Sequence, residues 1–157
     1  MSNAPRTDAF ETEVRIAAQP ETVFQFFLDP AKMVLWKGTE AALDPRPGGT
    51  YRVNVTGHEV ARGEYVEIVP FTRIVFTWGW ESGPVLPGST TVEVSFVPDG
   101  NGTIVRLRHS GLSDEALQAH VMGWEHYLPR LVIAAEGRDA GPDPWAAPHG
   151  GMASSSP

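Results

Sequence analysis

The sequence predicts an α+β protein in which a curved antiparallel sheet of about six or seven strands surrounds one long C-terminal helix. Two observations indicate this architecture. Most of the chain between residues 9 and 110 alternates apolar with polar residues at a period of two, as strands with one wet face do. Residues 113–136 instead repeat apolar residues at steps of three and four, as a helix does. Strands in series followed by a helix are typical of α+β proteins rather than of βαβ units.

Length and composition restrict the function classes. A chain of 157 residues has the size of one domain with a sizeable core. Its 12 basic and 19 acidic residues give a formal net charge of -7, which disfavours nucleic acid and anionic membranes as partners. It has no cysteine, so disulfides and thiolate chemistry are excluded. No leader or apolar segment of membrane-spanning length occurs, and we expect a cytoplasmic protein without membrane insertion.

The first predicted elements are one strand and two short helices. Residues 9–18 alternate as a strand. The spacing then becomes helical, with Pro20 at a position that a first helical turn tolerates. Pro30 breaks this helix, and residues 31–36 predict a second helical turn that ends before Gly38.

The middle of the chain predicts serial strands. Clusters of Gly, Pro, Asn and Asp mark the turns between them, and the strongest turn signal is PDGNG at residues 98–102. Because the strands follow one another at short spacing, they predict an antiparallel meander. The strands are expected at residues 40–44, 51–56, 60–69, 73–80, 90–97 and 103–109.

The long helix closes the predicted domain. Ser113 is a suitable N-cap because its hydroxyl can accept from a free amide of the first turn, and Gly137 ends the helix. Pro129 lacks a backbone donor, so we expect a kink near residues 125–129. The apolar stripe consists of Leu117, Val121, Trp124, Leu128 and Leu131. A helix gripped by a curved sheet leaves space between the two, which is a natural ligand site.

Three segments follow from this pattern. Residues 1–8 are polar and predict a flexible arm, and residues 9–136 form the folded domain. Residues 137–157 are rich in Gly, Pro and Ser without an apolar period, so we expect a disordered tail. Trp145 is the residue of that tail that could dock on the domain.

Four stretches of the chain also carry a family resemblance. They are PETVFQFFLDPAKMVLWKG at 20–38, RPGGTY at 46–51, the hairpin segments 63–68 and 73–78, and Gly123-Trp124 followed by Leu128 and Leu131. Together they cover residues 10 to 136 and resemble the activator of heat-shock protein 90 ATPase homologue family of the START-like, or polyketide cyclase, superfamily. The resemblance implies a helix-grip fold with a deep, mostly apolar cavity, and it allows a homodimer. It implies no fixed chemistry, because that superfamily includes ligand carriers, cyclases and co-chaperones.

The candidate site consists of aromatic and polar side chains that are predicted to face the interior, either by strand parity or by flanking the helical stripe. Aromatic walls with a few polar groups suit a flat, lipophilic ligand. The alternative is that the aromatic residues are core and that the histidines are hydrogen-bonded at its rim. The candidate ligand-binding residues are Phe76, Trp78, Trp80, His109, His120, Trp124 and Tyr127.

Acid–base catalysis is the second reading of the same residues. An imidazole opposite a phenol could move a proton, which makes His109, His120 and Tyr127 candidate catalysts. Glu64 joins them if strand alternation brings it inward, whereas a bulge near Gly63 would expose it.

Motifs for other chemistry are absent from the sequence. The five histidines show neither H-x-x-x-H nor HExxH spacing, and there is no G-x-S-x-G elbow or phosphate loop. We therefore expect neither a metal site nor a resident cofactor. The leading hypothesis is binding of a lipophilic small molecule. The alternatives are a polyketide cyclase- or dehydratase-like enzyme and, ranked last, contact with a chaperone whose ATPase it stimulates.

Overall fold

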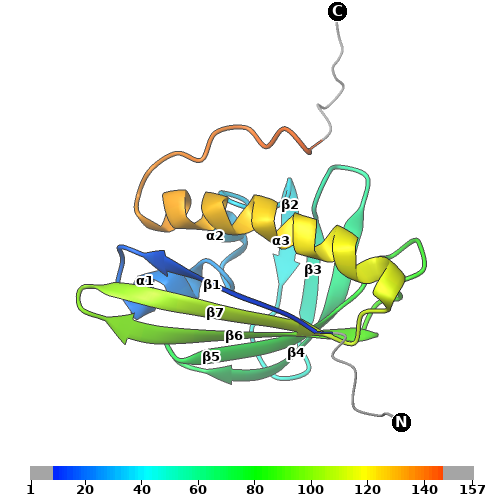
Figure 1. Cartoon of the computed structure of the whole chain (residues 1–157), viewed down its shortest axis with the longest axis horizontal. Coiled ribbons are helices and arrows are strands. Elements are labelled where there is room, and N and C mark those ends of the chain that lie inside the picture. The colour runs from blue at the N-terminus through cyan, green and yellow to red at the C-terminus, as the bar shows by residue number, and fades with distance from the viewer. Residues whose placement is uncertain (1–8, 147–157) are drawn as a thin grey trace, which may run out of the picture.

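The computed structural model describes residues 9–146 and shows a curved antiparallel sheet with one long helix across its concave face (Figure 1). The predicted α+β, helix-grip architecture is confirmed. The elements are β1 (Phe10–Ile16), α1 (Pro20–Gln25), α2 (Pro30–Met33), β2 (Glu40–Leu43), β3 (Thr50–Asn54), β4 (Val60–Val69), β5 (Arg73–Trp78), β6 (Thr90–Asp99), β7 (Gly102–Ser110) and α3 (Asp114–Ala135).

The order of the strands explains how the chain surrounds α3. The seven strands pair in the order β1-β7-β6-β5-β4-β3-β2, so consecutive strands from β2 to β7 are neighbours, as a meander requires. β1 lies at one edge and β2 at the other. The helices α1 and α2 therefore carry the chain from one edge of the sheet to the other. Phe24 and Phe27 fix this connection by meeting Phe96 of β6 edge to face.

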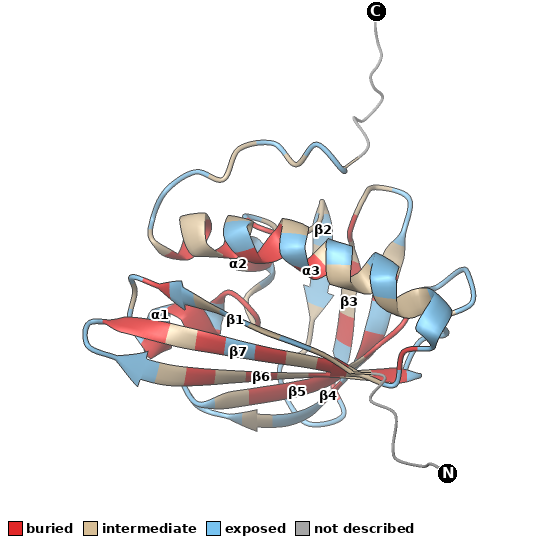
Figure 2. Ribbon diagram, in the orientation of Figure 1, coloured by how far each residue is buried: buried red, intermediate tan, exposed pale blue. Residues whose placement is uncertain are grey.

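Helix α3 buries one face against the sheet, and Figure 2 shows its buried residues on that side. The predicted N-cap is confirmed, because the Ser113 hydroxyl accepts from the Ala116 N–H at 3.1 Å. The helix runs as one element through Pro129. Neither α3 nor any other helix within residues 9–146 is long and apolar enough to cross a membrane.

The segment after α3, residues 137–146, returns along the helix (Figure 1). The Arg130 guanidinium holds it by donating to the carbonyl oxygens of Ala140 and Gly141, at 3.2 and 2.8 Å. Composition did not indicate this path because the contacts are polar and come from a residue on the helix. Residues 1–8 and 147–157, predicted to be flexible, lie outside the described residues.

An irregularity in β4 decides between the two predicted orientations of Glu64. The register with β5 shifts between Tyr65 and Glu67, so Tyr65 is buried, whereas Glu64 is exposed and Val66 is 53% exposed. Glu64 therefore does not point inward. The β5 backbone lies close to Gly63, since a Cβ on this residue would stand 1.9 Å from the Thr77 carbonyl oxygen.

Replacing Gly63 tests this close approach. We expect Gly63→Ala to lower the free energy of unfolding by about 2 kcal/mol, because β4 and β5 must separate to admit the methyl group. Urea denaturation measures the change. The matched control is Glu64→Ala at the neighbouring exposed position, where we expect a change within about 0.5 kcal/mol. Equal stabilities of the two variants would contradict the close strand approach.

Candidate functional site

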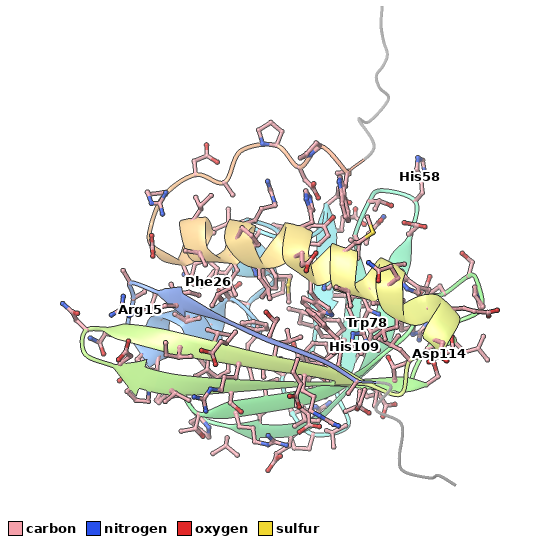
Figure 3. All side chains as sticks on the ribbon, in the orientation of Figure 1. Arg15, Phe26, His58, Trp78, His109 and Asp114 are labelled. Atoms are coloured by element: carbon pink, nitrogen blue, oxygen red, sulfur yellow. The ribbon has the colours of Figure 1, made fainter. Side chains whose placement is uncertain are left out.

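A cavity of about 240 Å³ lies between the sheet and α3. Five of the predicted ligand-binding residues line it, namely Trp78, Trp80, His120, Trp124 and Tyr127. Figure 3 shows Trp78 and His109 between the sheet and α3. A larger, open hollow of about 550 Å³ lies on the outer face of the sheet, but its arginines and glutamates pair with one another. We therefore place the candidate site in the inner cavity.

His109 lies behind the cavity wall and joins the helix to the sheet. Its Nδ1 accepts from Trp124 Nε1 at 3.0 Å, and its Nε2 lies 2.9 Å from the Thr90 hydroxyl oxygen. That hydroxyl donates to the Trp78 carbonyl oxygen, so the His109 Nε2–H must be the donor to Thr90. Both ring nitrogens of a neutral imidazole are therefore in use. Burial lowers the pKa of His109 to about 3, and repulsion from the protonated forms of His120 and Lys37 acts in the same direction.

His120 lines the cavity with its hydrogen bonds also satisfied. Its Nδ1–H donates to the Ala116 carbonyl oxygen at 2.8 Å, which leaves Nε2 to accept from Trp80 Nε1 at 3.0 Å. Burial lowers the pKa of His120 despite the opposing effect of the Ala116 hydrogen bond. The ring therefore presents no free lone pair to a ligand.

Tyr127 is tied to the segment that follows α3. Its hydroxyl donates to Asp143 Oδ2 at 2.6 Å, and the second oxygen of that carboxylate lies 2.7 Å from His126 Nε2. Burial raises the pKa of Tyr127, and the hydrogen bond to Asp143 raises it further. Burial alone would raise the pKa of Asp143, but the hydrogen bonds from Tyr127, His126 and the Trp145 N–H outweigh it and lower that pKa. The Trp145 ring stacks parallel to the His126 ring, with ring centres 3.9 Å apart, and borders the cavity.

Lys37 is the unexpected member of the site. It is only 3% exposed, and its ammonium lies 4.0 Å from the Trp78 ring centre and 4.1 Å from that of Trp124. Burial lowers the pKa of Lys37 well below its ordinary value of 10.5. Within residues 9–146, Trp78 Nε1 is the one fully buried side-chain nitrogen or oxygen that lacks a hydrogen-bond partner.

The structure does not bring every predicted residue to the cavity. Phe76 stacks on Tyr51 in the core, His109 lies behind Trp78 and Trp124, and Glu64 is exposed. Sequence reasoning missed Lys37 and Asp143. For Lys37 a signal existed: with Met33 and Trp36 it follows the i, i+3, i+4 spacing of a buried helical face. For Asp143 no local signal existed, since its partners are 16 and 17 residues away.

The state of His109 can be tested by pH. Protonation would set a His109 Nδ1–H against the Trp124 N–H, so the folded state holds the ring neutral while the unfolded chain takes up a proton below about 6.5. We therefore expect the free energy of unfolding to fall as the pH drops from about 6.5 toward 3. Urea denaturation across this range measures the loss, and nitrogen NMR of the folded protein should retain the Nε2–H tautomer at about pH 5. An imidazolium signal for His109 at that pH would contradict the assignment.

The contact of Asp143 can be tested by removal. Asp143→Ala leaves the buried Tyr127 hydroxyl without its acceptor, and we expect a loss of about 1–3 kcal/mol in the free energy of unfolding. Asp139→Ala is the matched control in the same segment, because its carboxylate accepts from the Gly141 N–H beside it. If the two variants unfold at the same denaturant concentration, the segment contributes nothing through Tyr127.

Comparison with known proteins identifies the family of this chain. The family model described as Activator of Hsp90 ATPase homolog 1-like protein matches residues 17–136. An AHSA1-like protein from Rhizobium etli is 43% identical, with 99% of each chain covered and a TM-score of 0.73. A search of curated proteins found no match.

Two further solved structures share the fold alone. DynU16, a protein of the dynemicin biosynthetic locus, is 20% identical over 88% of this chain and 51% of its own, with a TM-score of 0.75. An HSP90 activator from Plasmodium falciparum is 24% identical over 78% of this chain and 92% of its own, with a TM-score of 0.64. The match over residues 17–136 and the Rhizobium etli relative show that this chain belongs to the Activator of Hsp90 ATPase homolog 1-like family.

Proposed function

We propose that the protein binds a hydrophobic or aromatic small molecule in the cavity beneath α3. The observation that carries this proposal is the cavity of about 240 Å³ with four indole rings in its wall, Trp78, Trp80, Trp124 and Trp145. A dry cavity of about 150 Å³ is enough for benzene, so the space suits a compound of one or two rings. Indole faces and edges provide the contacts that flat aromatic ligands favour.

The polar groups of the wall support the same proposal. His120 accepts from Trp80 and donates to the Ala116 carbonyl oxygen, and Tyr127 donates to Asp143, so both side chains offer the cavity little more than ring surface. An apolar ligand can therefore enter without leaving these groups unpaired.

The enzyme alternative receives less support from the same geometry. A general base requires a lone pair within reach of its substrate, and the lone pairs of His109 and His120 accept from Trp124 and Trp80. The Tyr127 hydroxyl donates a hydrogen bond to Asp143, and burial raises its pKa, so it is a poor proton donor to a substrate. Stimulation of a chaperone ATPase stays a prediction from the family resemblance.

A cavity-filling variant tests the binding proposal. Gly123 lines the cavity, and a Cβ on it would meet no atom within 4 Å, so we expect Gly123→Leu to occupy the space without displacing the core. The wild-type protein should gain about 2.7 kcal/mol in the free energy of unfolding at a ligand concentration of about 100 times Kd. Thermal shift with a panel of one- and two-ring aromatic compounds measures this gain, which Gly123→Leu should abolish.

The control adds the same side chain elsewhere on the helix. Gln118→Leu places a leucine at an exposed position of α3 and should leave the ligand-induced shift unchanged. Because leucine also removes the helix penalty of glycine, about 1 kcal/mol, loss of binding in Gly123→Leu would not come from unfolding. If no compound of the panel shifts the wild-type melting temperature, or if the shift survives in Gly123→Leu, binding in this cavity is refuted.

A further inference from the structure

Lys37 is held at the cavity by the backbone around it. Its N–H donates to the Met33 carbonyl oxygen at 2.9 Å. The next residue, Gly38, has a φ of 92°, and a Cβ on it would stand 2.6 Å from Val53 Cγ1 and 2.8 Å from the Asn54 carbonyl oxygen. This glycine lets the chain turn directly against β3, which directs the lysine side chain inward between the two indoles. The amine is thus placed by rigid neighbours rather than by a mobile loop.

The amine has no acceptor within residues 9–146. Its contacts there are with aromatic rings, and it makes no hydrogen bond or ion pair through its side chain. Asp143 already accepts from Tyr127 and His126, and Glu59 is an exposed residue at the border of the cavity. The indole faces favour a positive charge, yet they replace neither water nor a carboxylate. An unpaired ammonium is costly at such a site, and the neutral amine is favoured.

We propose that the ε-amine of Lys37 forms an imine with the carbonyl carbon of an aromatic aldehyde or ketone bound in the cavity. This inference rests on the proposed function, because the ligand occupies the same space. A neutral lysine in an apolar pocket is the form that attacks carbonyl groups. The lysine nitrogen bonds to the carbonyl carbon, the carbon–oxygen bond breaks, and the oxygen leaves as water with the two amine hydrogens. No oxidant or reductant takes part.

The surroundings of Lys37 also suit the product. The imine nitrogen lies between the Trp78 and Trp124 rings, and a neutral imine has no charge to desolvate and no N–H donor to leave unpaired. The rest of the ligand then fills the space bordered by Trp80, Gly123 and Trp145. The class of ligand follows from these two requirements: a carbonyl group attached to one or two flat rings.

Trapping with hydride tests the proposal, and the composition of the chain sharpens it. The chain contains two lysines, Lys32 and Lys37, and no cysteine, so few groups compete. The full chain is incubated with 2-naphthaldehyde and sodium cyanoborohydride, and fragment mass spectrometry locates the secondary amine that forms. Only the neutral amine reacts, and burial keeps a larger fraction of Lys37 neutral than of partly exposed Lys32. We therefore expect the Lys37 adduct to exceed the Lys32 adduct by about tenfold or more.

Two variants and one unreactive ligand separate the outcomes. Lys37→Met should lose the adduct while still giving a thermal shift with 2-methylnaphthalene, and Gly123→Leu should protect Lys37 from modification. If 2-methylnaphthalene binds the wild-type protein but Lys37 is modified no faster than Lys32, the imine is refuted and the binding function stands. If neither naphthalene compound binds and Lys37 is not modified, both proposals fail. An adduct at Lys37 that persists in Gly123→Leu would also overturn the proposal, since the aldehyde would not arrive through the cavity.

Discussion

The hydrogen bond from Trp124 Nε1 to His109 Nδ1 joins α3 to β7 of the sheet, and the cavity depends on it. It places an indole of the helix beside the Trp78 indole of β5, with ring centres 5.9 Å apart. Toward its C-terminal end, α3 packs with small and aliphatic residues such as Leu131, Ala134 and Ala135, all buried in the core. The open space therefore lies beside the aromatic part of the helix, and the closed core lies beside the aliphatic part.

The histidines around this space have both ring nitrogens hydrogen-bonded. The chain of donors from Trp124 through His109 and Thr90 ends on the Trp78 carbonyl oxygen, and Trp80 caps the free nitrogen of His120. Buried groups that are paired in this way stabilise one arrangement of the core, because each broken pair leaves an unsatisfied atom. Lys37 stands apart from the network. Its side chain has aromatic neighbours and no acceptor among residues 9–146, which makes its chemistry different from that of the histidines.

Charge and family membership account for less of the site than these contacts do. Acids and arginines of the sheet pair on its outer face, as Glu13 does with Arg106 and Glu11 with Arg108. The net charge of -7 therefore does not describe the cavity, whose wall is mainly aromatic. Family membership accounts for the architecture but not for the ligand, because one fold supports many activities. What the cavity can bind follows from the residues that face it, and above all from Trp78, Trp124 and Lys37.

The order of the elements, the α+β class and the cap at Ser113 were determined by the sequence alone, because strand alternation, helical spacing and capping are local properties. The inward position of Trp78 follows from the same alternation. Other features were decided only by the tertiary structure. The shifted register after Tyr65 turned Glu64 outward, and distant partners placed Asp143 on Tyr127. The spacing of Lys37 with Met33 and Trp36 indicates locally that it is buried, but the indoles that enclose it are 41 and 87 positions further along the chain. Contacts of that kind form only when distant segments fold against each other, so the aromatic surroundings of Lys37 could not be predicted from local spacing.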